Sequence, residues 1–234
     1  SKPQYRKQYL EADETSPFKN GEILNDTYWS WGYSYIGWNS DSAFFSDKLV
    51  RQAMSHAFNA DKFLEEVQLG LGKRTSGPIS PDLPYYDESL PLIPFDLDRA
   101  AQLLDQAGWT DTDGNGIRDK VVNGNKVEFD FSFIIVAGSS TVKTIGEIFK
   151  NDLLKIGVKM SLRPLEWANM QKKLHSKDFQ AITLGWATSP DVDFYQLWHS
   201  TQADIPKGSN YVGFRHPEAD KIIEEMELEF DIGK

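Results

Sequence analysis

Hydrophobic residues along this chain follow two spacings, and the stretches that carry them alternate. Apolar positions at helical spacing predict helices over residues 47–58 and 61–69. A longer helix is predicted before Gly157, with an apolar stripe of Val142, Ile145, Phe149, Leu153 and Ile156. Residues 70–94 carry repeated prolines and predict a loop, because proline removes a backbone donor from any helix or sheet.

Aromatic and alternating stretches predict the strands. Residues 28–39 are typical of a long aromatic strand, and residues 126–136 of a second one. In the second, one face collects the apolar side chains of Val127, Phe129, Phe131, Phe133 and Ile135. The Asn123-Gly124 pair that precedes it favours a two-residue hairpin turn.

From residue 126 onward the predicted strands are joined through helices. The predicted order is strand 126–136, helix, strand 158–163, helix 166–175 and strand 179–186. Helices of this length between strands imply right-handed parallel crossovers. The predicted fold class is therefore α/β, a mixed sheet with parallel βαβ crossovers and flanking helices.

Residues 95–109 combine a helix with its start and stop signals. Asp96 can cap the helix, and Phe95 is placed as the hydrophobic staple before the cap. The inward stripe is predicted to consist of Leu97, Ala100, Ala101, Leu104 and Ala107. Gly108 in a left-handed conformation would end the helix and let Trp109 fold back on Leu104.

The turn after this helix is rich in side-chain acceptors. The positions of a calcium-binding loop are matched by Asp111, Asp113, Asn115 and Gly116, by the carbonyl of Ile117 and by Asp119. Val122 stands where such loops need a bidentate glutamate. Two alternatives remain: a weak calcium site, or an unmetallated turn held by hydrogen bonds of its own side chains. No cofactor is predicted to be required.

The predicted topology also indicates where a ligand would bind. In open α/β sheets the crevice lies beyond the carboxyl ends of the parallel strands. One loop there contains Gly138, Ser139, Ser140 and Thr141, whose amides and hydroxyls can hold a carboxylate or another acceptor group. The alternative is that Ser139 or Ser140 only caps the following helix. The second loop at this edge is residues 186–195.

Composition and charge exclude several classes of protein. The chain has no cysteine, which excludes a disulfide framework, a cysteine nucleophile and a thiolate metal site. A net charge of −10 argues against nucleic acid and against an anionic membrane surface. No apolar run approaches the roughly 20 residues of a membrane-spanning helix. The histidines are widely separated and no nucleophile motif is present, so an enzyme is not predicted.

Several stretches resemble, in the same order, signatures of the family 5 extracellular solute-binding proteins, the peptide- and nickel-binding receptors of bacterial ABC importers. They are residues 35–39, 46–53, 59–62, 77–81, 95–119, 154–159, 178–186 and 216–220. The resemblance implies a lobe of the type II periplasmic binding protein kind. It also implies a small solute and ABC permease transmembrane subunits as partners, with no nucleic acid.

The family's receptors are longer than this chain, and the matching stretches belong to their second lobe. The resemblance therefore implies that residues 1–234 are a single excised C-terminal lobe. Within it, residues 1–40 would be a hinge-proximal strand region and residues 41–234 the lobe core. Family members are exported, which implies the periplasm or the extracellular face of the cytoplasmic membrane. A lipid anchor on the full-length protein is left open.

The resemblance also assigns roles around Trp186. In the family this tryptophan walls a side-chain pocket, and the residues just after it, here beginning with Ala187, line the cleft. Peptide-binding members carry an aspartate where this chain has Ser189, and oligopeptide binders an arginine where it has Thr183. Asp191 or Asp193 can replace the missing aspartate or, alternatively, cap the next helix.

The resemblance implies a peptide as the first expectation for the ligand, whereas the replacements at Ser189 and Thr183 argue against a free dipeptide or short peptide and leave sugars, nickel chelates and blocked peptides open. A neutral hydroxyl cannot replace a carboxylate paired with an ammonium group, because charged hydrogen bonds are stronger. Stacking on a sugar would suit the aromatic residues Tyr28, Trp29, Trp31 and Tyr33, although aromatics in a strand more often pack. The alternative function is a secreted carbohydrate-binding or calcium-dependent module.

Overall fold

A four-stranded mixed sheet forms the centre of the computed structural model, which describes residues 5–24, 30–188 and 193–229. The strand order is β1-β6-β4-β5, with β1 (Tyr33–Trp38), β4 (Asp130–Val136), β5 (Lys159–Leu165) and β6 (Ala181–Trp186). β4 pairs in parallel with both β5 and β6, whereas β1 pairs antiparallel with β6. The predicted mixed sheet with parallel strand pairs is confirmed.

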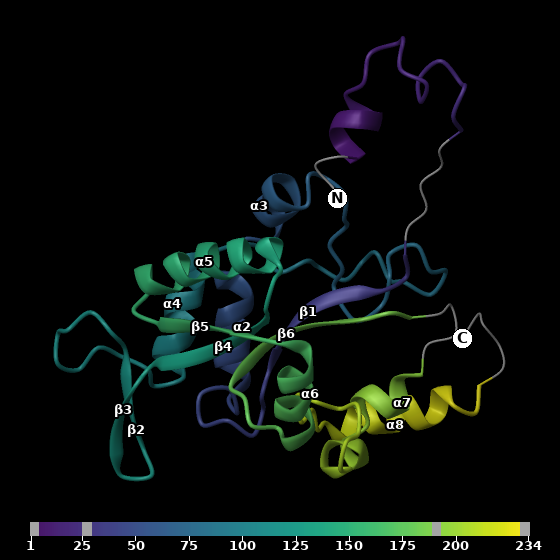
Figure 1. Cartoon of the computed structure of the whole chain (residues 1–234). Coiled ribbons are helices and arrows are strands. Elements are labelled where there is room, and N and C mark those ends of the chain that lie inside the picture. The colour runs from purple at the N-terminus through teal and green to yellow at the C-terminus, as the bar shows by residue number, and fades with distance from the viewer. Residues whose placement is uncertain (1–4, 25–29, 189–192, 230–234) are drawn as a thin grey trace.

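Helices cover both faces of this sheet (Figure 1). They are α2 (Lys48–Ala57), α4 (Leu97–Gln106), α5 (Ser140–Lys155), α6 (Trp167–Ser176), α7 (Phe194–Trp198) and α8 (Pro217–Met226). α5 connects β4 to β5 and α6 connects β5 to β6, as the alternating pattern predicted. α2, α4 and α5 pack on one face, and α6 covers the other. None of the helices described is long and apolar enough to cross a membrane.

Alternate side chains of β4 and the residue before it face two different cores. Phe129, Phe131, Phe133 and Ile135 are buried in the larger core, under α2, α4 and α5, as their shared face predicted. Ile134 points to the opposite face. There it joins a smaller core beneath α6, whose other buried members are Met170, Leu174, Phe179 and Ile182. The sheet is therefore covered on both sides, as expected for parallel strands.

The stretch predicted as one strand, residues 126–136, is in fact two strands. β3 (Asn125–Glu128) pairs with β2 (Asp119–Val122) in a separate ribbon, and β4 begins at Asp130. Phe129 joins them: its N–H donates to the Arg118 carbonyl (2.7 Å), and its carbonyl accepts from the Lys159 amide (2.9 Å). The chain thus changes hydrogen-bonding partner at Phe129. This exchange depends on residues far away in the sequence.

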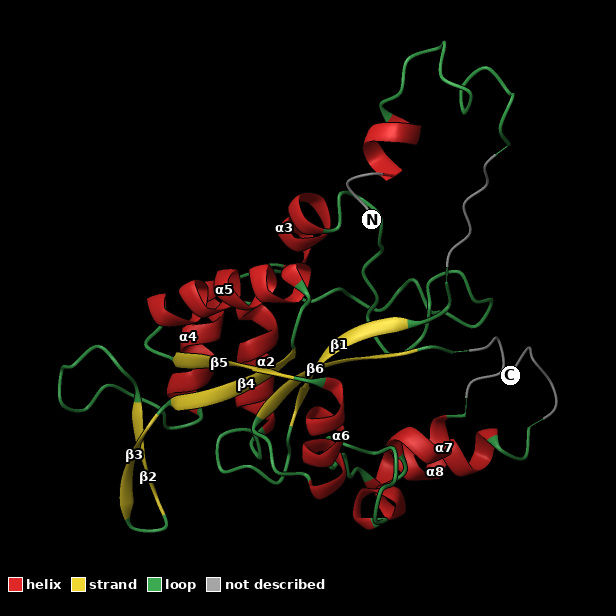
Figure 2. Ribbon diagram, in the orientation of Figure 1, coloured by secondary structure: helices red, strands yellow, loops and turns green. Residues whose placement is uncertain are grey.

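The hairpin turn of the ribbon is confirmed. Asn123 and Gly124 have φ angles of 50° and 79°, both in the left-handed region that a type I′ turn requires. Figure 2 shows the ribbon projecting from one end of the main sheet.

The helix at residues 97–106 begins and ends as predicted. The Asp96 carboxylate accepts from the Arg99 amide (2.8 Å), and Gly108 has a φ of 81°. The Trp109 N–H donates to the Leu104 carbonyl and the Gly108 N–H to that of Asp105, each at 2.9 Å, which is the Schellman pattern. The stripe prediction missed Leu103, which is buried. Phe95 remains 36% exposed, so the predicted staple is not buried.

Two other predicted elements are shorter than expected. β1 begins at Tyr33, so Trp31 precedes the strand and the earlier part of the prediction, Tyr28 and Trp29, lies outside the described residues. The predicted helix at 61–69 is α3 (Ala60–Lys62) followed by a wider helical turn, η2 (Phe63–Val67). Short turns also occur at η1 (Arg6–Leu10) and η3 (Ser200–Asp204), and residues 70–94 are irregular, as predicted.

Candidate functional site

The carboxyl ends of the three parallel strands form one edge of the sheet. β4, β5 and β6 end at Val136, Leu165 and Trp186. The Ala137 amide donates to the Leu165 carbonyl (2.8 Å), so the loop after β4 lies beside the start of α6. Since β4 lies between β6 and β5, the loop at 138–141 separates Trp186 from the first turn of α6. This edge is where the topology predicts a ligand crevice.

Trp186 is the last residue of β6 and is partly exposed. Its ring stacks on Tyr211, with ring centroids 5.6 Å apart and an interplanar angle of 3°. Tyr33 lies opposite it at the end of the β1–β6 ladder. The indole is thus held on one side by a second ring while part of it reaches solvent. Trp186 is therefore not a core residue, and its role as a pocket wall stays a prediction.

Tyrosine hydroxyls near Trp186 remain uncharged at neutral pH. Burial raises the pKa of Tyr33 to about 12. Burial also raises the pKa of Tyr35, an effect offset in part by its hydrogen bond with Trp186. Burial likewise raises the pKa of Tyr211. These three side chains are therefore neutral aromatic residues.

The loop after β4 caps the helix that comes next. Ser139 is the N-cap of α5, and its hydroxyl accepts from the Val142 amide (3.3 Å). This is the capping alternative of the sequence prediction. Gly138, with a φ of 82°, and Ser140 are exposed, and Thr141 is partly exposed. A role of these residues in binding a ligand stays a prediction.

The second loop is described only in part. Ala187 is exposed, and the Thr188 hydroxyl donates to the Trp31 carbonyl. Ser189 and Asp191 lie outside the described residues. Asp193 accepts from the Gln196 amide (3.1 Å) as the N-cap of α7, so the capping alternative holds for this residue.

Thr183 lies within β6 and not at its end. It pairs with Ile36 of β1, three residues before Trp186 along the strand. Because side chains alternate along a strand, Thr183 and Trp186 point to opposite faces of the sheet. Thr183 is therefore not beside the indole.

Two residues of this edge were missed by sequence reasoning. Trp167 is the first residue of α6, directly after β5, and its residue surface is 53% exposed. Tyr211, the stacking partner of Trp186, comes from the loop before α8. Trp167 could have been found as an aromatic residue just beyond a predicted strand end. No local signal marks Tyr211, because its contact with Trp186 is formed only by the fold.

The acidic turn brings together most of the residues predicted for it. Oxygens of Asp111, Asp113 and Asp119 lie within 4.8 Å of one another. The Asp111 carboxylate accepts from the amides of Gly114 (2.8 Å) and Gly116 (2.9 Å). The turn is therefore closed by hydrogen bonds of its own side chains.

Asn115 and Asp119, which were also predicted as calcium ligands, are hydrogen-bonded to neighbouring residues of the turn and the ribbon. The Asn115 side-chain carbonyl accepts from the Ile117 amide (2.8 Å), and its amide group donates to Glu128 (2.9 Å). Asp119, which is buried, accepts from the Thr112 hydroxyl (2.7 Å) and amide (3.0 Å).

A lysine side chain occupies the centre of the acidic cluster. The Lys126 ammonium is 2.6 Å from Asp113 Oδ2 and 3.3 Å from Asp119 Oδ2. Its hydrogen bond to Asp113 raises the pKa of Lys126 and lowers that of Asp113. Two of the three carboxylates in the cluster, those of Asp113 and Asp119, are thus already paired with this ammonium group. In Figure 1 this ribbon lies at the opposite end of the molecule from the carboxyl end of β6.

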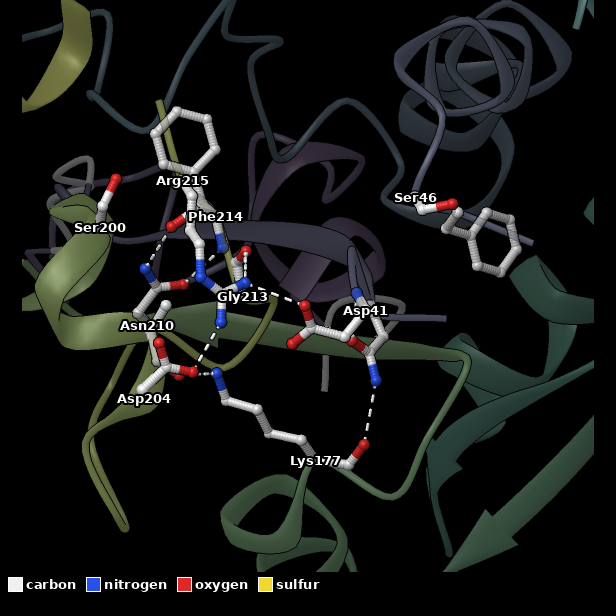
Figure 3. Close-up of polar contacts among 12 residues, drawn as sticks. Asp41, Ser46, Lys177, Ser200, Asp204, Asn210, Gly213, Phe214 and Arg215 are labelled. Atoms are coloured by element: carbon white, nitrogen blue, oxygen red, sulfur yellow. Dashed lines mark hydrogen bonds and ion pairs between the residues drawn. The ribbon is translucent and has the colours of Figure 1, made fainter. Parts of the chain in front are cut away.

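A further polar cluster ties the C-terminal region to the loop after β1 (Figure 3). Arg215 donates to Asp41 (2.9 Å) and to Asp204 (2.7 Å), and Lys177 donates to the Ala203 carbonyl. A Cβ on Gly213 would lie 2.9 Å from Asp41 Oδ2. The cluster lies at the edge of the sheet opposite Trp186, and its groups are paired with one another. Its arrangement is that of a structural tie between segments.

Comparisons with known proteins match most of the chain to one family. Residues 4–205 match the family described as bacterial extracellular solute-binding proteins, family 5 Middle. The oligopeptide-binding protein AppA of Bacillus subtilis (strain 168) is 35% identical over 212 residues, which are 89% of this chain and 38% of that protein. Heme-binding protein A of Haemophilus influenzae is 28% identical over 195 residues, which are 82% and 33% of the two chains.

Solved structures show the same fold. AppA from Bacillus subtilis in complex with a nonapeptide superposes with a TM-score of 0.80 at 30% identity, covering 98% of this chain and 46% of that chain. The oligopeptide-binding protein from Thermus thermophilus, complexed with a pentapeptide, gives 0.75 at 25% identity, with coverages of 86% and 37%. The chain therefore spans less than half the length of these relatives.

Proposed function

This chain belongs to the bacterial extracellular solute-binding proteins, family 5, and on that premise we propose that it supplies one lobe of the substrate-binding component of a bacterial ABC importer. The family resemblance and the predicted type II periplasmic binding protein-like lobe are both confirmed by the comparisons. Members of this family are solute-binding components of transport systems. That this chain has no catalytic activity stays a prediction.

The ligand that we propose is a peptide held at the carboxyl edge of the sheet. The observation that carries this proposal is Trp186, partly exposed at that edge and stacked on Tyr211. AppA, which is 35% identical, is named as an oligopeptide-binding protein, and the related structure contains a nonapeptide. An extended peptide offers apolar side chains that can pack on the indole.

The residues at this edge indicate that ion pairs contribute little to ligand binding by this lobe. Tyr33, which pairs with Trp186, and Tyr211, which stacks on it, are neutral side chains. A peptide terminus would gain no ion pair from them. We therefore propose that this lobe grips the middle of a peptide by stacking and packing, which also keeps blocked peptides, sugars and chelates as ligands to test.

The organisation of the full-length protein is part of the proposal. Residues 1–234 would be a single lobe, with a hinge-proximal region at 1–40 and the lobe core at 41–234. The ligand would close between this lobe and another, and the closed receptor would dock on ABC permease subunits outside the cytoplasmic membrane. Lipid anchoring stays a prediction. That no cofactor is required stays a prediction, which the hydrogen bonds of the acidic turn and its pairing with Lys126 support.

Calorimetry on the full-length receptor tests the ligand. A tetrapeptide and a nonapeptide are expected to bind, with a mannose oligosaccharide and a nickel–histidine chelate as competing ligands. Trp186→Ala should weaken peptide binding by about tenfold or more, because a buried aromatic contact is worth about 1–3 kcal/mol. Tyr85→Ala, an exposed aromatic of the proline-rich loop, is the matched control. Unchanged peptide affinity in Trp186→Ala, or binding of the sugar or chelate alone, would overturn the proposal.

A further inference from the structure

The chain segments just beyond the last pair of the β1–β6 ladder remain close to each other. Tyr33 and Trp186 are the final pair of the ladder. In an antiparallel ladder the next residues are opposed in reverse order, so Gly32 faces Ala187 and Trp31 faces Thr188. The Thr188 hydroxyl donates to the Trp31 carbonyl. A side-chain hydrogen bond therefore ties the two segments together just beyond the last backbone pair of the ladder.

Gly32 lies unusually close to the opposite strand. A Cβ at this position would be 2.6 Å from the Trp186 carbonyl oxygen and 3.3 Å from the Ala187 Cα. Both are backbone atoms, which cannot move without moving the strand. Any side chain at residue 32 would thus push the two strands apart at the residue that carries the indole.

Gly77 provides a contrast. A Cβ there would have no neighbour within 4 Å, and the backbone of Gly77 does not require the left-handed conformation. The close approach at Gly32 is therefore a property of its position beside the end of β6 and not of glycine in general.

The position of the Trp186 ring depends on this end of β6. The ring is stacked nearly parallel on Tyr211, with an interplanar angle of 3°. A stacked pair of this kind tolerates little displacement, because offset and angle set the interaction between the rings. If the Trp186 backbone moves away from β1, the ring moves relative to Tyr211.

From these contacts we infer that Gly32 and Thr188 are positioning residues for Trp186: they hold the end of β6 against the chain before β1 and so fix the indole at the binding edge. The inference rests on the proposed function for its effect on ligand affinity. The effect on the position of the Trp186 ring does not depend on any ligand. The ring position and the ligand affinity can therefore be measured separately.

The first readout is fluorine NMR of the ligand-free full-length receptor labelled with fluorotryptophan. The Trp186 resonance is assigned by its loss in Trp186→Phe. In Gly32→Ala it should shift, while the resonance of the core residue Trp109 stays in place. Gly77→Ala is the matched control and should move neither. An unmoved Trp186 resonance in Gly32→Ala would overturn the inference.

The second readout is affinity for a tetrapeptide measured by calorimetry. Gly32→Ala should weaken binding by about tenfold, since a binding group displaced by about 1 Å loses much of its contribution. Thr188→Val keeps the side-chain volume, removes the donor, and should give a smaller shift and loss in the same direction. This second variant keeps the test open if Gly32→Ala folds poorly.

The outcomes distinguish this inference from the proposed function. A shifted Trp186 resonance with unchanged peptide affinity would contradict a positioning role in binding. Failure of the wild-type receptor to bind either peptide would overturn the peptide proposal, whereas a shift of Trp186 in both variants would still support the structural tie. Unchanged thermal unfolding in Thr188→Val with weaker binding would exclude a general loss of stability.

Discussion

Two tryptophans at opposite ends of the sheet show how differently the same side chain is used. Trp109 is 1% exposed and is packed between Phe44 and Phe129, with ring centroids at 5.7 Å and 4.5 Å. Trp186 is partly exposed and stacks on one ring, that of Tyr211. Trp109 follows the end of α4, and Trp186 is the last residue of β6. They differ in what surrounds the side chain beyond the end of the helix or strand.

The path of the chain after each element produces this difference. After α4 the chain turns back at Gly108, so Trp109 is carried under the helix into the larger core. After β6 the chain runs on beside Gly32, and Thr188 donates to the Trp31 carbonyl, so Trp186 stays at the carboxyl edge. The reversal of the chain at Gly108 buries Trp109, whereas the continuation of the chain after β6 leaves Trp186 partly exposed. We therefore expect Trp109 to contribute mainly to stability and Trp186 mainly to ligand binding.

Truncating the buried indole should have the largest effect. Trp109→Ala is expected to lower the free energy of unfolding by about 3–5 kcal/mol, because it empties a site lined by Phe44 and Phe129. Urea unfolding of the full-length receptor measures the change. Trp109→Phe, which keeps a ring in the site, should cost less. A loss below about 1 kcal/mol for the alanine variant would show that this end of the molecule is not a close-packed core.

Truncating Trp186 should change peptide affinity more than stability. Trp186→Ala is expected to lower the free energy of unfolding by less than about 1 kcal/mol, because the side chain is partly exposed and has one stacking partner. Its main effect should be on peptide affinity. Measuring urea unfolding and calorimetry on the same preparation tests this. A large loss of stability would mean that Trp186 is a core residue and would remove the contrast with Trp109.

Sequence reasoning reached the Trp109 end of the molecule more completely than the Trp186 end. The cap at Asp96, the left-handed Gly108 and the return of Trp109 onto Leu104 obey local rules, and all are present. The change of strand partner at Phe129 was missed, because it depends on Arg118 and on the distant Lys159. Local patterns specify caps and turns. They do not specify which distant backbone completes a hydrogen-bond ladder.

The candidate site was predictable in place but not in detail. The carboxyl edge is implied by the order of strands and helices, which the sequence pattern indicated. The partner of Trp186 was not implied, since Tyr211 comes from a separate loop before α8. The close approach of Gly32 to the Trp186 carbonyl was equally invisible, because a glycine in sequence does not reveal which atoms face it.

The cap of α4 offers a medium-sized test of the same contrast. Asp96→Ala should lower the free energy of unfolding by about 1 kcal/mol, because the Arg99 amide loses its acceptor. Hydrogen exchange should show weaker protection in α4 and no change in β6. Asp98→Ala, which removes an exposed carboxylate from the first turn, is the control. Equal losses in the two variants would indicate a charge effect and not a cap.

The acidic turn beside the Trp109 end should respond only weakly to calcium. Lys126 already pairs with Asp113 and Asp119, so added calcium or a chelator should leave the melting temperature of the wild type unchanged. Lys126→Gln frees both carboxylates and should give the turn a measurable response to calcium. Lys221→Gln, in an exposed pair with Glu225, is the control. An equally strong response in wild type would revive the calcium site.

The smallest effect expected is a pH dependence from the same ion pair. The hydrogen bond from Lys126 lowers the pKa of Asp113 below its usual value near 3.8. A carboxyl group with a lowered folded-state pKa stabilises the fold above its unfolded-state pKa, and this stabilisation is lost as pH falls through the folded-state value. The loss should therefore begin near pH 4 and continue below it.

Urea unfolding across this pH range tests the prediction. The free energy of unfolding should decline less steeply with falling pH in Lys126→Gln than in wild type, because that variant lacks the ion pair at every pH. Parallel curves would show that the exposed pair contributes nothing measurable, as is common for surface ion pairs. The fold near Trp109 would then depend on packing alone.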